Sequence, residues 1–263
     1  MGKLFVLFLF VLPFQLYAQL PVGARYSAMA NASAALTGLD ALAGNSAGIT
    51  SLSDIAASLS LENEWLSAPI RTNAFVVVPS AVAHVGLAGA VYETGDAFRE
   101  LQLAAALGRR VSDRFSIGTR LSYSQLSFSD LEGSMSRLTA DLGFQYRFRP
   151  NWMWGLELIS PIALDRSKED VVPLFKLGTR FAFSPQTLIA LQAAYSARGG
   201  ADFSIGLEYE VLSWLQLRGG ISVDPFMHYG GLGVLMNRFR ADGALRIHPQ
   251  LGVSPQMTLG YAF

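Results

Sequence analysis

The side chains that most often carry out catalysis or bind metals are few in this sequence. Three histidines, His84, His228 and His248, lie far apart, with no Glu or His at the spacing of a metal site. Cysteine is absent, which removes thiolate ligands, cysteine nucleophiles and disulfides. The glycines at 230–233 do not fit a GxGxxG turn between a strand and a helix. We therefore predict no enzyme, no cofactor and no metal, with His228 as the one histidine to examine for an esterase.

The charged residues are sparse and balanced. Of 263 residues, 51% are hydrophobic and only 15% are charged, and 20 Lys and Arg offset 20 Asp and Glu. Disordered chains combine low hydrophobicity with high net charge, so disorder is excluded. A net charge of +0 gives no electrostatic reason to expect nucleic-acid binding. Soluble domains carry roughly 25% charged residues, so the chain is either an unusually apolar globular protein or a membrane protein.

The N-terminus has the layout of a secretory signal peptide. A short positive start at Lys3 precedes an unbroken apolar run from Leu4 to Leu12, and Ala18 offers a small residue for cleavage. The apolar run is shorter than the roughly 20 residues of a transmembrane helix. We therefore expect residues 1–18 to be removed during export. An uncleaved N-terminal anchor is the alternative.

Apolar and polar residues alternate with a period of two through most of the remaining chain. Phe115, Ile117 and Leu121 alternate with Ser116, Gly118 and Arg120, and the same pattern recurs from 138, 175 and 203. Successive residues of a strand point to opposite faces, so each segment has one apolar face and one polar or glycine face. A soluble sandwich would show the same alternation with its apolar faces turned inward.

The length of these segments favours a transmembrane barrel over a sandwich. They are about 10–14 residues long, as tilted membrane strands are, whereas soluble strands average about 5–6. The uncharged stretch Thr72–Tyr92 could span as a helix, but Pro79 inside it indicates a turn between two strands. The chain ends on Tyr261 and Phe263, which resembles the terminal signal read by the barrel-assembly machinery. We expect an all-β outer-membrane barrel of a Gram-negative bacterium, surrounded by outer-membrane lipid.

Counting the segments predicts about fourteen strands within a barrel domain of residues 54–263. An even number is the rule for bacterial barrels. The expected strands lie near 55–66, 69–79, 82–92, 98–110, 113–127, 134–148, 152–163, 172–184, 186–197, 200–212, 214–223, 227–237, 239–247 and 251–263.

The connections between strands predict the orientation. The short ones at Pro79–Ala81, Val111–Ser112 and Arg149–Asn151 should face the periplasm. The longer, acidic ones at Glu93–Ala97, Ser129–Gly133 and Asp165–Val171 should face outside, which is the usual asymmetry of such barrels. Aromatic residues at Tyr146, Phe148, Trp152 and Trp154 indicate a girdle at one membrane boundary.

The face predicted to line the lumen carries charges of both signs. A pore selective for one ion sign would line its wall with one charge, so mixed charges indicate a closed structural network. Residues 19–53 are rich in Ala, Ser and Gly, contain no barrel strand, and are predicted to form a hatch or plug in the lumen. The expected lumen network comprises Arg120, Arg137, Asp141, Arg147, Lys176, Arg180, Glu208, Glu210, Arg218, Arg240 and Asp242.

The start of the mature chain resembles the PorV/PorQ family. The similarity lies in the stretch Pro21–Met29, in residues 31–36 and in 104–118. Asn45, Ser46, Ala47 and Gly48 stand where that family and the wider FadL-like superfamily carry Asn-Pro-Ala-Gly; here Ser46 replaces the proline. This resemblance implies a FadL-like barrel of fourteen strands with an N-terminal hatch, and partners among secretion-system proteins or their cargo.

Two function classes remain open at this stage. The resemblance implies a scaffold or accessory protein of a type IX secretion-like system. The alternative is FadL-like uptake of a hydrophobic small molecule, and an outer-membrane enzyme is the least favoured class. The mixed lumen charges favour the scaffold, because a hydrophobic ligand requires an apolar pocket with few polar groups.

Overall fold

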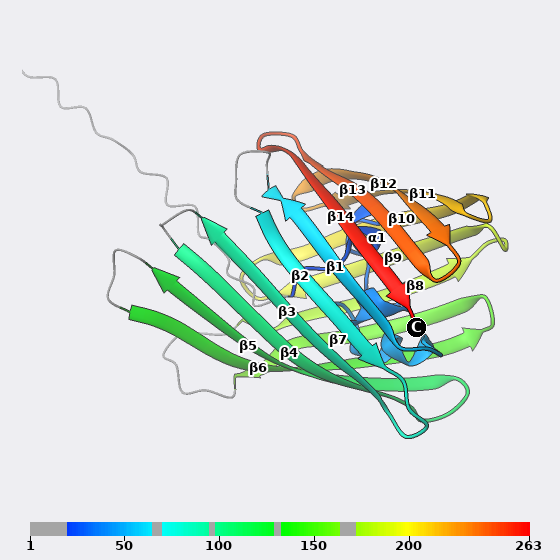
Figure 1. Cartoon of the computed structure of the whole chain (residues 1–263), viewed down its shortest axis with the longest axis horizontal. Helices are drawn as coiled ribbons and strands as arrows, with labels where there is room; N and C mark the ends of the chain where they lie inside the picture. The colour runs from blue at the N-terminus through cyan, green and yellow to red at the C-terminus, as the bar shows by residue number, and fades with distance from the viewer. Residues whose placement is uncertain (1–19, 65–69, 95–97, 129–132, 164–171) are drawn as a thin grey trace, which may run out of the picture.

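The structure is a computed structural model that describes residues 20–64, 70–94, 98–128, 133–163 and 172–263. Fourteen antiparallel strands form one closed barrel, in which each strand pairs with its neighbours in the sequence (Figure 1). The strands are β1 Ala56–Asn63, β2 Ile70–Val78, β3 His84–Thr94, β4 Phe98–Arg110, β5 Phe115–Phe128, β6 Gly133–Arg149, β7 Trp152–Ala163, β8 Leu174–Ala182, β9 Thr187–Ser196, β10 Gly200–Leu212, β11 Leu215–Val223, β12 Phe226–Met236, β13 Phe239–His248 and β14 Gly252–Ala262.

The ring is closed by the first and last strands. β1 pairs with β14 from Ala56 opposite Ala262 to Glu62 opposite Gln256. This closure leaves no strand edge with unpaired backbone groups, which lipid could not hydrogen-bond. The sequence predicted fourteen strands in this order, and β4, β7 and β10 begin and end at the predicted residues.

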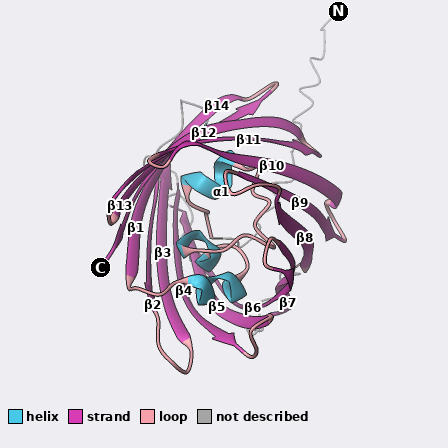
Figure 2. Ribbon diagram, turned by 90° about the vertical axis from the view of Figure 1, so that its right-hand side faces the viewer, coloured by secondary structure: helices cyan, strands magenta, loops and turns pink. Residues whose placement is uncertain are grey.

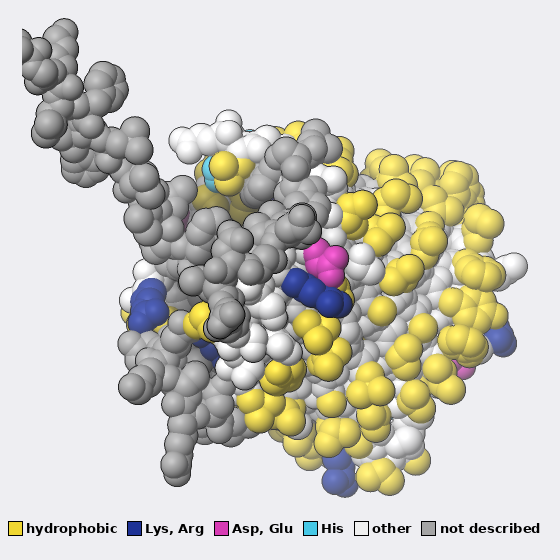
Figure 3. All heavy atoms as spheres, turned by 60° about the vertical axis from the view of Figure 1, so that its left-hand side comes forward, with side chains coloured by type: hydrophobic (Ala, Val, Ile, Leu, Met, Phe, Trp, Pro, Cys, Tyr) yellow, Lys and Arg dark blue, Asp and Glu magenta, His cyan; other side chains and the backbone are white. Residues whose placement is uncertain are grey.

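The two faces of the wall differ as the alternation predicts. The outward face carries large exposed apolar side chains on every strand, among them Leu59, Leu87, Leu107, Leu177 and Leu245. Figure 3 shows these hydrophobic side chains spread over the barrel surface, with few charged ones between them. Such an exterior is unfavourable in water and suits the hydrocarbon core of a bilayer.

Among the described residues, no helix has the length and apolar character needed to cross a membrane.

The segment before β1 folds back into the lumen, where Figure 2 shows its short helices enclosed by the ring of strands. It contains the helix α1 Ala24–Ala28 and two 3-10 helices, η1 Leu39–Leu42 and η2 Ser46–Ser51. Most of its side chains are buried. Residues 20–53 are called the hatch below.

Several predictions from the sequence lie outside the described residues. These are the signal peptide at 1–18 and most of the three connections expected to face outside, at 95–97, 129–132 and 165–171. The orientation of the barrel in the membrane therefore stays a prediction. The end that carries the connections 79–83, 111–114, 150–151, 183–186, 213–214 and 237–238 is called the turn end below.

Candidate functional site: the hatch and the lumen wall

The hatch lies directly against the backbone of the wall, because glycines line the lumen where the two meet. At nine of these glycines a Cβ atom would overlap hatch atoms, so no larger residue could occupy the position unless the hatch shifted. Buried Ala190 on β9 and Ala244 on β13 continue this ring of small residues. The nine glycines are Gly86, Gly108, Gly118, Gly143, Gly155, Gly178, Gly206, Gly220 and Gly231, one on each of β3 to β8 and β10 to β12.

Asn45, the first residue of the predicted hatch motif, fixes the hatch to β6 and β7. Its side-chain Nδ2 lies 2.7 Å from the Ala34 carbonyl oxygen and 3.0 and 3.1 Å from those of Phe144 and Leu156. Its Oδ1 accepts a hydrogen bond from the Ala47 amide at 3.1 Å and so caps η2. The fully buried amide therefore satisfies backbone groups of the hatch and of the wall together.

The other motif residues belong to the same contact. Ser46 and Ala47 lie against Gly118, and the Ser46 carbonyl also approaches Gly108. Gly48 is required for close packing, since a Cβ there would meet the Leu36 carbonyl oxygen. The structure thus brings Asn45, Ser46, Ala47 and Gly48 together at the hatch and wall interface.

Two wall glutamines bind hatch backbone that has no helical partner. Gln145 Nε2 donates to the Leu36 carbonyl at 2.8 Å. Gln192 Oε1 accepts from the Ala34 amide at 3.0 Å, and its Nε2 donates to the Asn31 carbonyl at 3.2 Å. Both side chains are buried. Each of their hydrogen bonds therefore satisfies a hatch backbone group that would otherwise need a water molecule as its partner. Neither glutamine was predicted from the sequence.

Arg25 of the hatch forms a two-pronged ion pair with Glu208 on β10. Its Nε and Nη2 each lie 2.8 Å from a carboxylate oxygen of Glu208, and its Nη1 donates to the Thr37 carbonyl at 3.0 Å. Burial alone would lower the pKa of Arg25, but the charge and hydrogen bonds of Glu208 outweigh it and raise that pKa. Arg25 is therefore a permanent cation that ties the hatch to the wall.

Glu208 belongs to a chain of alternating charges that crosses β10 to β13. Arg218 Nε lies 2.7 Å from Glu208, and its Nη1 lies 2.8 Å from Asp242. Arg240 Nε approaches the second Asp242 oxygen at 2.6 Å. Gly233 leaves the room that the Arg218 guanidinium needs to reach Asp242. These four predicted lumen residues are thus brought together, and Arg25 joins them.

A second charged cluster connects β5 to β8. Arg120 is only 1% exposed; its Nη2 lies 2.6 Å from Asp141, and its Nη1 donates to the hatch carbonyls of Leu42 and Gly44 at 2.8 and 2.9 Å. Glu157 lies 3.6 Å from both Arg120 and Lys176. Two cations and two carboxylates make this cluster neutral. The predicted residues Arg120, Asp141 and Lys176 therefore belong to one network, to which Glu157 is added.

Asp141 also stabilises an irregular part of the wall. Its Oδ1 accepts the backbone amide of Ser160 at 2.7 Å. Ser160 has a φ of 50° and precedes Pro161, and the pairing of β6 with β7 shifts at this point. The carboxylate thus replaces a ladder hydrogen bond that the bulge removes.

The other predicted lumen charges lie outside these two clusters. Arg137, Arg180 and Glu210 are half-buried on the inner face. Arg147 is exposed at the turn end, where it lies beside the hatch in a small crevice. At the opposite end, Arg246 pairs with Glu62 at 3.0 Å.

Hatch groups that can titrate are buried among these charges. Burial raises the pKa of the Asp40 carboxyl, although Arg240 opposes that shift. Burial likewise raises the pKa of Tyr26, and its hydroxyl has no hydrogen-bond partner among the described residues.

One side of the lumen is apolar. Phe75 and Val77 on β2, Ala88 on β3, and Ala104 and Ala106 on β4 are buried on the inner face. They form one hydrophobic cluster with the hatch side chains of Leu36, Leu42 and Ile49. These five wall residues of β2, β3 and β4 are called the apolar lane below. The two charged clusters lie on β5 to β8 and on β10 to β13, whereas the lane packs against the hatch on β2 to β4.

The histidines do not form a catalytic group in the described part of the chain. His228 is exposed on the outer face, with its ring 4.8 Å from that of Phe226. His84 contacts the Leu52 carbonyl at 2.9 Å, and His248 Nδ1 accepts the amides of Gln250 and Leu251. No cluster of three or more metal-ligating side chains occurs among the described residues.

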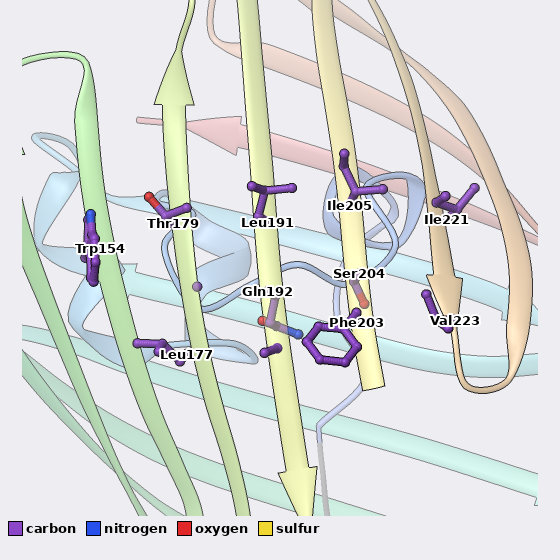
Figure 4. Close-up of a pocket in the computed structure, with 12 residues that line it drawn as sticks. Trp154, Leu177, Thr179, Leu191, Gln192, Phe203, Ser204, Ile205, Ile221 and Val223 are labelled. Carbon is purple, nitrogen blue, oxygen red and sulfur yellow. The ribbon is translucent and has the colours of Figure 1, made fainter. Parts of the chain in front are cut away.

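The outer surface carries an apolar groove of about 430 Å³ over β7 to β11, shown in Figure 4. Trp154, Leu177, Leu191, Ile205 and Ile221 extend around it from successive strands. Gly178 and Ala193, which lack large side chains, form part of its floor. Ala34 of the hatch lies behind Gly178.

The C-terminal aromatic residues lie where the ring closes. Phe263 donates its backbone amide to the Ile55 carbonyl at 2.8 Å, and its ring lies 4.9 Å from that of Tyr261. Their role as an assembly signal stays a prediction.

Comparisons with known proteins show the fold. No family model matches the chain, and no curated protein is similar to it. A FadL homologue from Pseudomonas aeruginosa superimposes with a TM-score of 0.72 at 12% identity, covering 93% of this chain and 99% of that one. CymD, a monoaromatic hydrocarbon channel, gives 0.70 at 12% identity with coverages of 93% and 98%. TodX, a toluene transporter from P. putida, gives 0.69 at 12% identity with coverages of 92% and 98%.

These similarities extend over nearly the whole length of each chain. The specific relationship to the PorV/PorQ family is not shown, so it stays a prediction. The closed ring and its apolar exterior agree with a location in the outer membrane of a Gram-negative bacterium, as predicted. The protein has the fold of the FadL-like outer-membrane barrels.

Proposed function

We propose that the protein is an outer-membrane channel for small hydrophobic compounds. The proposal rests on the apolar lane, in which buried Phe75, Val77, Ala88, Ala104 and Ala106 lead along the inner wall to apolar hatch residues. A hydrocarbon can contact these side chains without losing hydrogen bonds to water, because none of the five carries a polar atom. The fold of hydrocarbon channels such as TodX and CymD agrees with this use.

The lumen charges do not oppose this function, although the sequence analysis took them to favour a scaffold. Arg120 is paired with Asp141, and Arg218 is paired with Glu208 and Asp242. These networks lie on other strands than the lane, and they hold the hatch through Arg25 and Arg120. Their charge is therefore accounted for by hatch anchoring, without a secretion partner.

The test is uptake of a labelled monoaromatic hydrocarbon by cells that contain or lack the protein. We expect uptake to be faster with the protein. Ala104→Phe narrows the lane and should lower the rate several-fold. Ala105→Phe places the same ring on the lipid-facing side of the same strand and should leave the rate unchanged. Ala104→Leu repeats the lane block with a smaller side chain, in case Phe impairs folding.

Both sets of variants must first show the heat-dependent mobility shift of a folded barrel. Equal uptake with and without the protein would contradict the proposal, as would equal losses for Ala104→Phe and Ala105→Phe. Unchanged uptake together with stable co-purification of secretion proteins would favour the scaffold instead.

A further inference from the structure

Five arginines cluster at the turn end of the barrel. Arg109 and Arg110 end β4, Arg114 lies in the next turn, and Arg147 and Arg149 end β6. All five are exposed. They lie on neighbouring strands, because β4 pairs with β5 and β5 with β6, and the Arg147 amide donates to the Arg114 carbonyl at 2.7 Å. These residues are called the arginine patch.

The patch lacks counter-charges, unlike the arginines of the lumen. In the part of the chain that the structure describes, none of the five lies within 4.0 Å of a carboxylate oxygen, and Asp113 is the one acidic residue in the adjoining connections. Lumen Arg120 and Arg218 each contact two carboxylates. Five unpaired guanidinium groups form a positive surface suited to an external anion.

The patch is confined to one sector of the turn end. The connections 79–83, 183–186 and 213–214 contain no charged residue, and 237–238 contains only Arg238. A general preference for positive charge at a membrane boundary would distribute arginine around the ring. The sector from β4 to β7 is therefore a distinct surface.

Aromatic side chains place this sector at the level of the lipid headgroups. Phe148 and Trp152 have ring centroids 5.0 Å apart, and Trp152 also contacts Trp154 and Phe181 at 6.1 and 6.3 Å. Phe148 and Trp154 are about half-exposed on the outer face. Tryptophan and other aromatic rings collect at the membrane and water interface of barrels, so this cluster marks the boundary.

The arginines lie immediately next to that boundary. Arg149 follows Phe148 in the chain, with its Cζ 5.9 Å from the Phe148 ring centroid. Arg109 follows Leu107 on the lipid-facing side of β4 with one residue between them, a step of about 7 Å along a strand. A guanidinium group at this depth meets phosphate groups, while its aliphatic stem stays in the apolar layer.

We propose that Arg109, Arg114 and Arg149 of the arginine patch bind the phosphate groups of anionic phospholipids in the leaflet at the turn end, while Arg110 and Arg147, which lie beside the hatch, add positive charge next to them. A guanidinium group donates two parallel hydrogen bonds to phosphate oxygens, which explains arginine rather than lysine at the three lipid-binding positions. Arg110 also donates to the hatch carbonyl of Thr50 at 2.8 Å, so bound lipid lies beside the hatch.

Quenching of tryptophan fluorescence by brominated lipids tests the proposal at two places on the same boundary. One variant, Trp65→Phe with Trp214→Phe, keeps Trp152 and Trp154 beside the patch. The other, Trp65→Phe with Trp152→Phe and Trp154→Phe, keeps Trp214 in the turn 213–214, away from the patch. Each is reconstituted in phosphatidylcholine vesicles that contain a minor fraction of brominated phosphatidylglycerol or brominated phosphatidylcholine.

We expect brominated phosphatidylglycerol to quench Trp152 and Trp154 several-fold more than brominated phosphatidylcholine, and to show no such preference at Trp214. Replacing Arg109, Arg114 and Arg149 with Gln should abolish the preference; Arg110 is kept because it contacts the hatch. Arg238→Gln, an exposed arginine at the same end, is the matched control and should leave it unchanged.

Equal preference at both reporters would overturn the proposal, because it would show a uniform boundary effect. A preference that survives the triple replacement in a folded barrel would overturn it as well. Loss of the preference with Arg238→Gln would show that net charge, rather than the patch, attracts the lipid.

Discussion

At the residue scale, Arg25 shows how the hatch is held by charge in a lumen that excludes water. Its guanidinium is almost fully enclosed and satisfied by both oxygens of Glu208 and by the Thr37 carbonyl. A buried ion pair offsets the free energy lost by removing both charges from water only when its hydrogen-bond geometry is good. Removing one charge leaves the other buried with one partner fewer. The pair is thus a strong constraint on position even where its net contribution to stability is small.

Separate and joint replacement of this pair should give different results. Glu208→Gln alone should destabilise the seated hatch by about 3–5 kcal/mol, because Arg25 is left buried without a carboxylate, whereas Arg25→Met should cost less because Glu208 keeps Arg218. The double variant Arg25→Met with Glu208→Gln should recover part of the Glu208→Gln loss, because no unpaired Arg25 remains and Arg218 keeps Asp242. The free energy of unfolding from urea titration in detergent micelles measures it, and additive losses would contradict the coupling.

Asp40 makes the stability of the seated hatch depend on pH. Because burial raises the pKa of this carboxyl, the folded state favours its neutral form. Its contribution to stability is therefore fully present below the ordinary aspartate pKa and is lost as pH rises toward the raised value. Asp40→Asn removes the titration, so the variant should hold its hatch against protease at neutral pH better than the parent.

The difference between Asp40→Asn and the parent should vanish at acidic pH, where Asp40 is neutral in both states. Limited proteolysis of the hatch between pH 4 and pH 8 measures it. A parent hatch that becomes more resistant as pH rises, while the variant does not change, would contradict the assignment.

At the scale of elements, the strands could be predicted from the sequence and the hatch contacts could not. Alternation is a local signal, since each strand residue faces lipid or lumen according to its position alone, and it located β4, β7 and β10 to the residue. The alternation also placed Gly118, Gly143, Gly178 and Gly206 on the inner face. Their meaning depends on hatch atoms more than 70 positions earlier in the chain, which no local pattern encodes.

Because alternation is a local signal, only some residues of the site could be predicted. Asp141, Glu208 and Arg218 were predicted because charges on a strand's inner face must be paired. Arg25 was not singled out for this role, because the hatch has no period that would indicate which of its side chains faces the wall. Gln145 and Gln192 were missed, since a neutral amide on a polar face carries no signal that it binds backbone.

Two substitutions distinguish a wall glycine that contacts the hatch from one that does not. Gly143→Ala places a Cβ against the Asn45 side chain and should unseat the hatch. Gly230→Ala adds the same methyl group where nothing lies within 4 Å, and should be close to neutral. Protease sensitivity of the hatch reports the difference; equal sensitivity of the two variants would show that close packing does not hold it.

At the scale of the whole molecule, the hatch and the wall form a closed unit with a neutral interior cluster on β5 to β8 and an apolar lane on β2 to β4. The wall supplies a shape that many outer-membrane proteins share, and in the proposed channel the hatch would determine what can pass. The fold was predictable because strands that cross lipid can satisfy their backbone groups in few architectures. The proposed channel function was predicted only as the alternative to a scaffold, since the lane depends on which lumen positions are apolar together with which hatch residues cover them.

Removal of the hatch should convert the protein into an open pore. The intact protein should conduct ions poorly in a planar bilayer, and deletion of residues 20–53 should produce a stable, large conductance. The deletion variant must still show the mobility shift of a folded barrel. Large conductance in the intact protein would show that the hatch does not seal the lumen.

The closure of β1 onto β14 constrains the order in which the protein is made. The hatch directly precedes β1, and its contacts with the glycines of the wall lie on β3 to β8 and β10 to β12, which are synthesised before the last strand. A hatch that entered after closure would have to carry buried Asn45 and Arg25 along a lumen narrowed by side chains. We therefore expect the hatch to fold against a still-open sheet, so that it acts as an internal template around which the wall curves before the final pair of strands is joined.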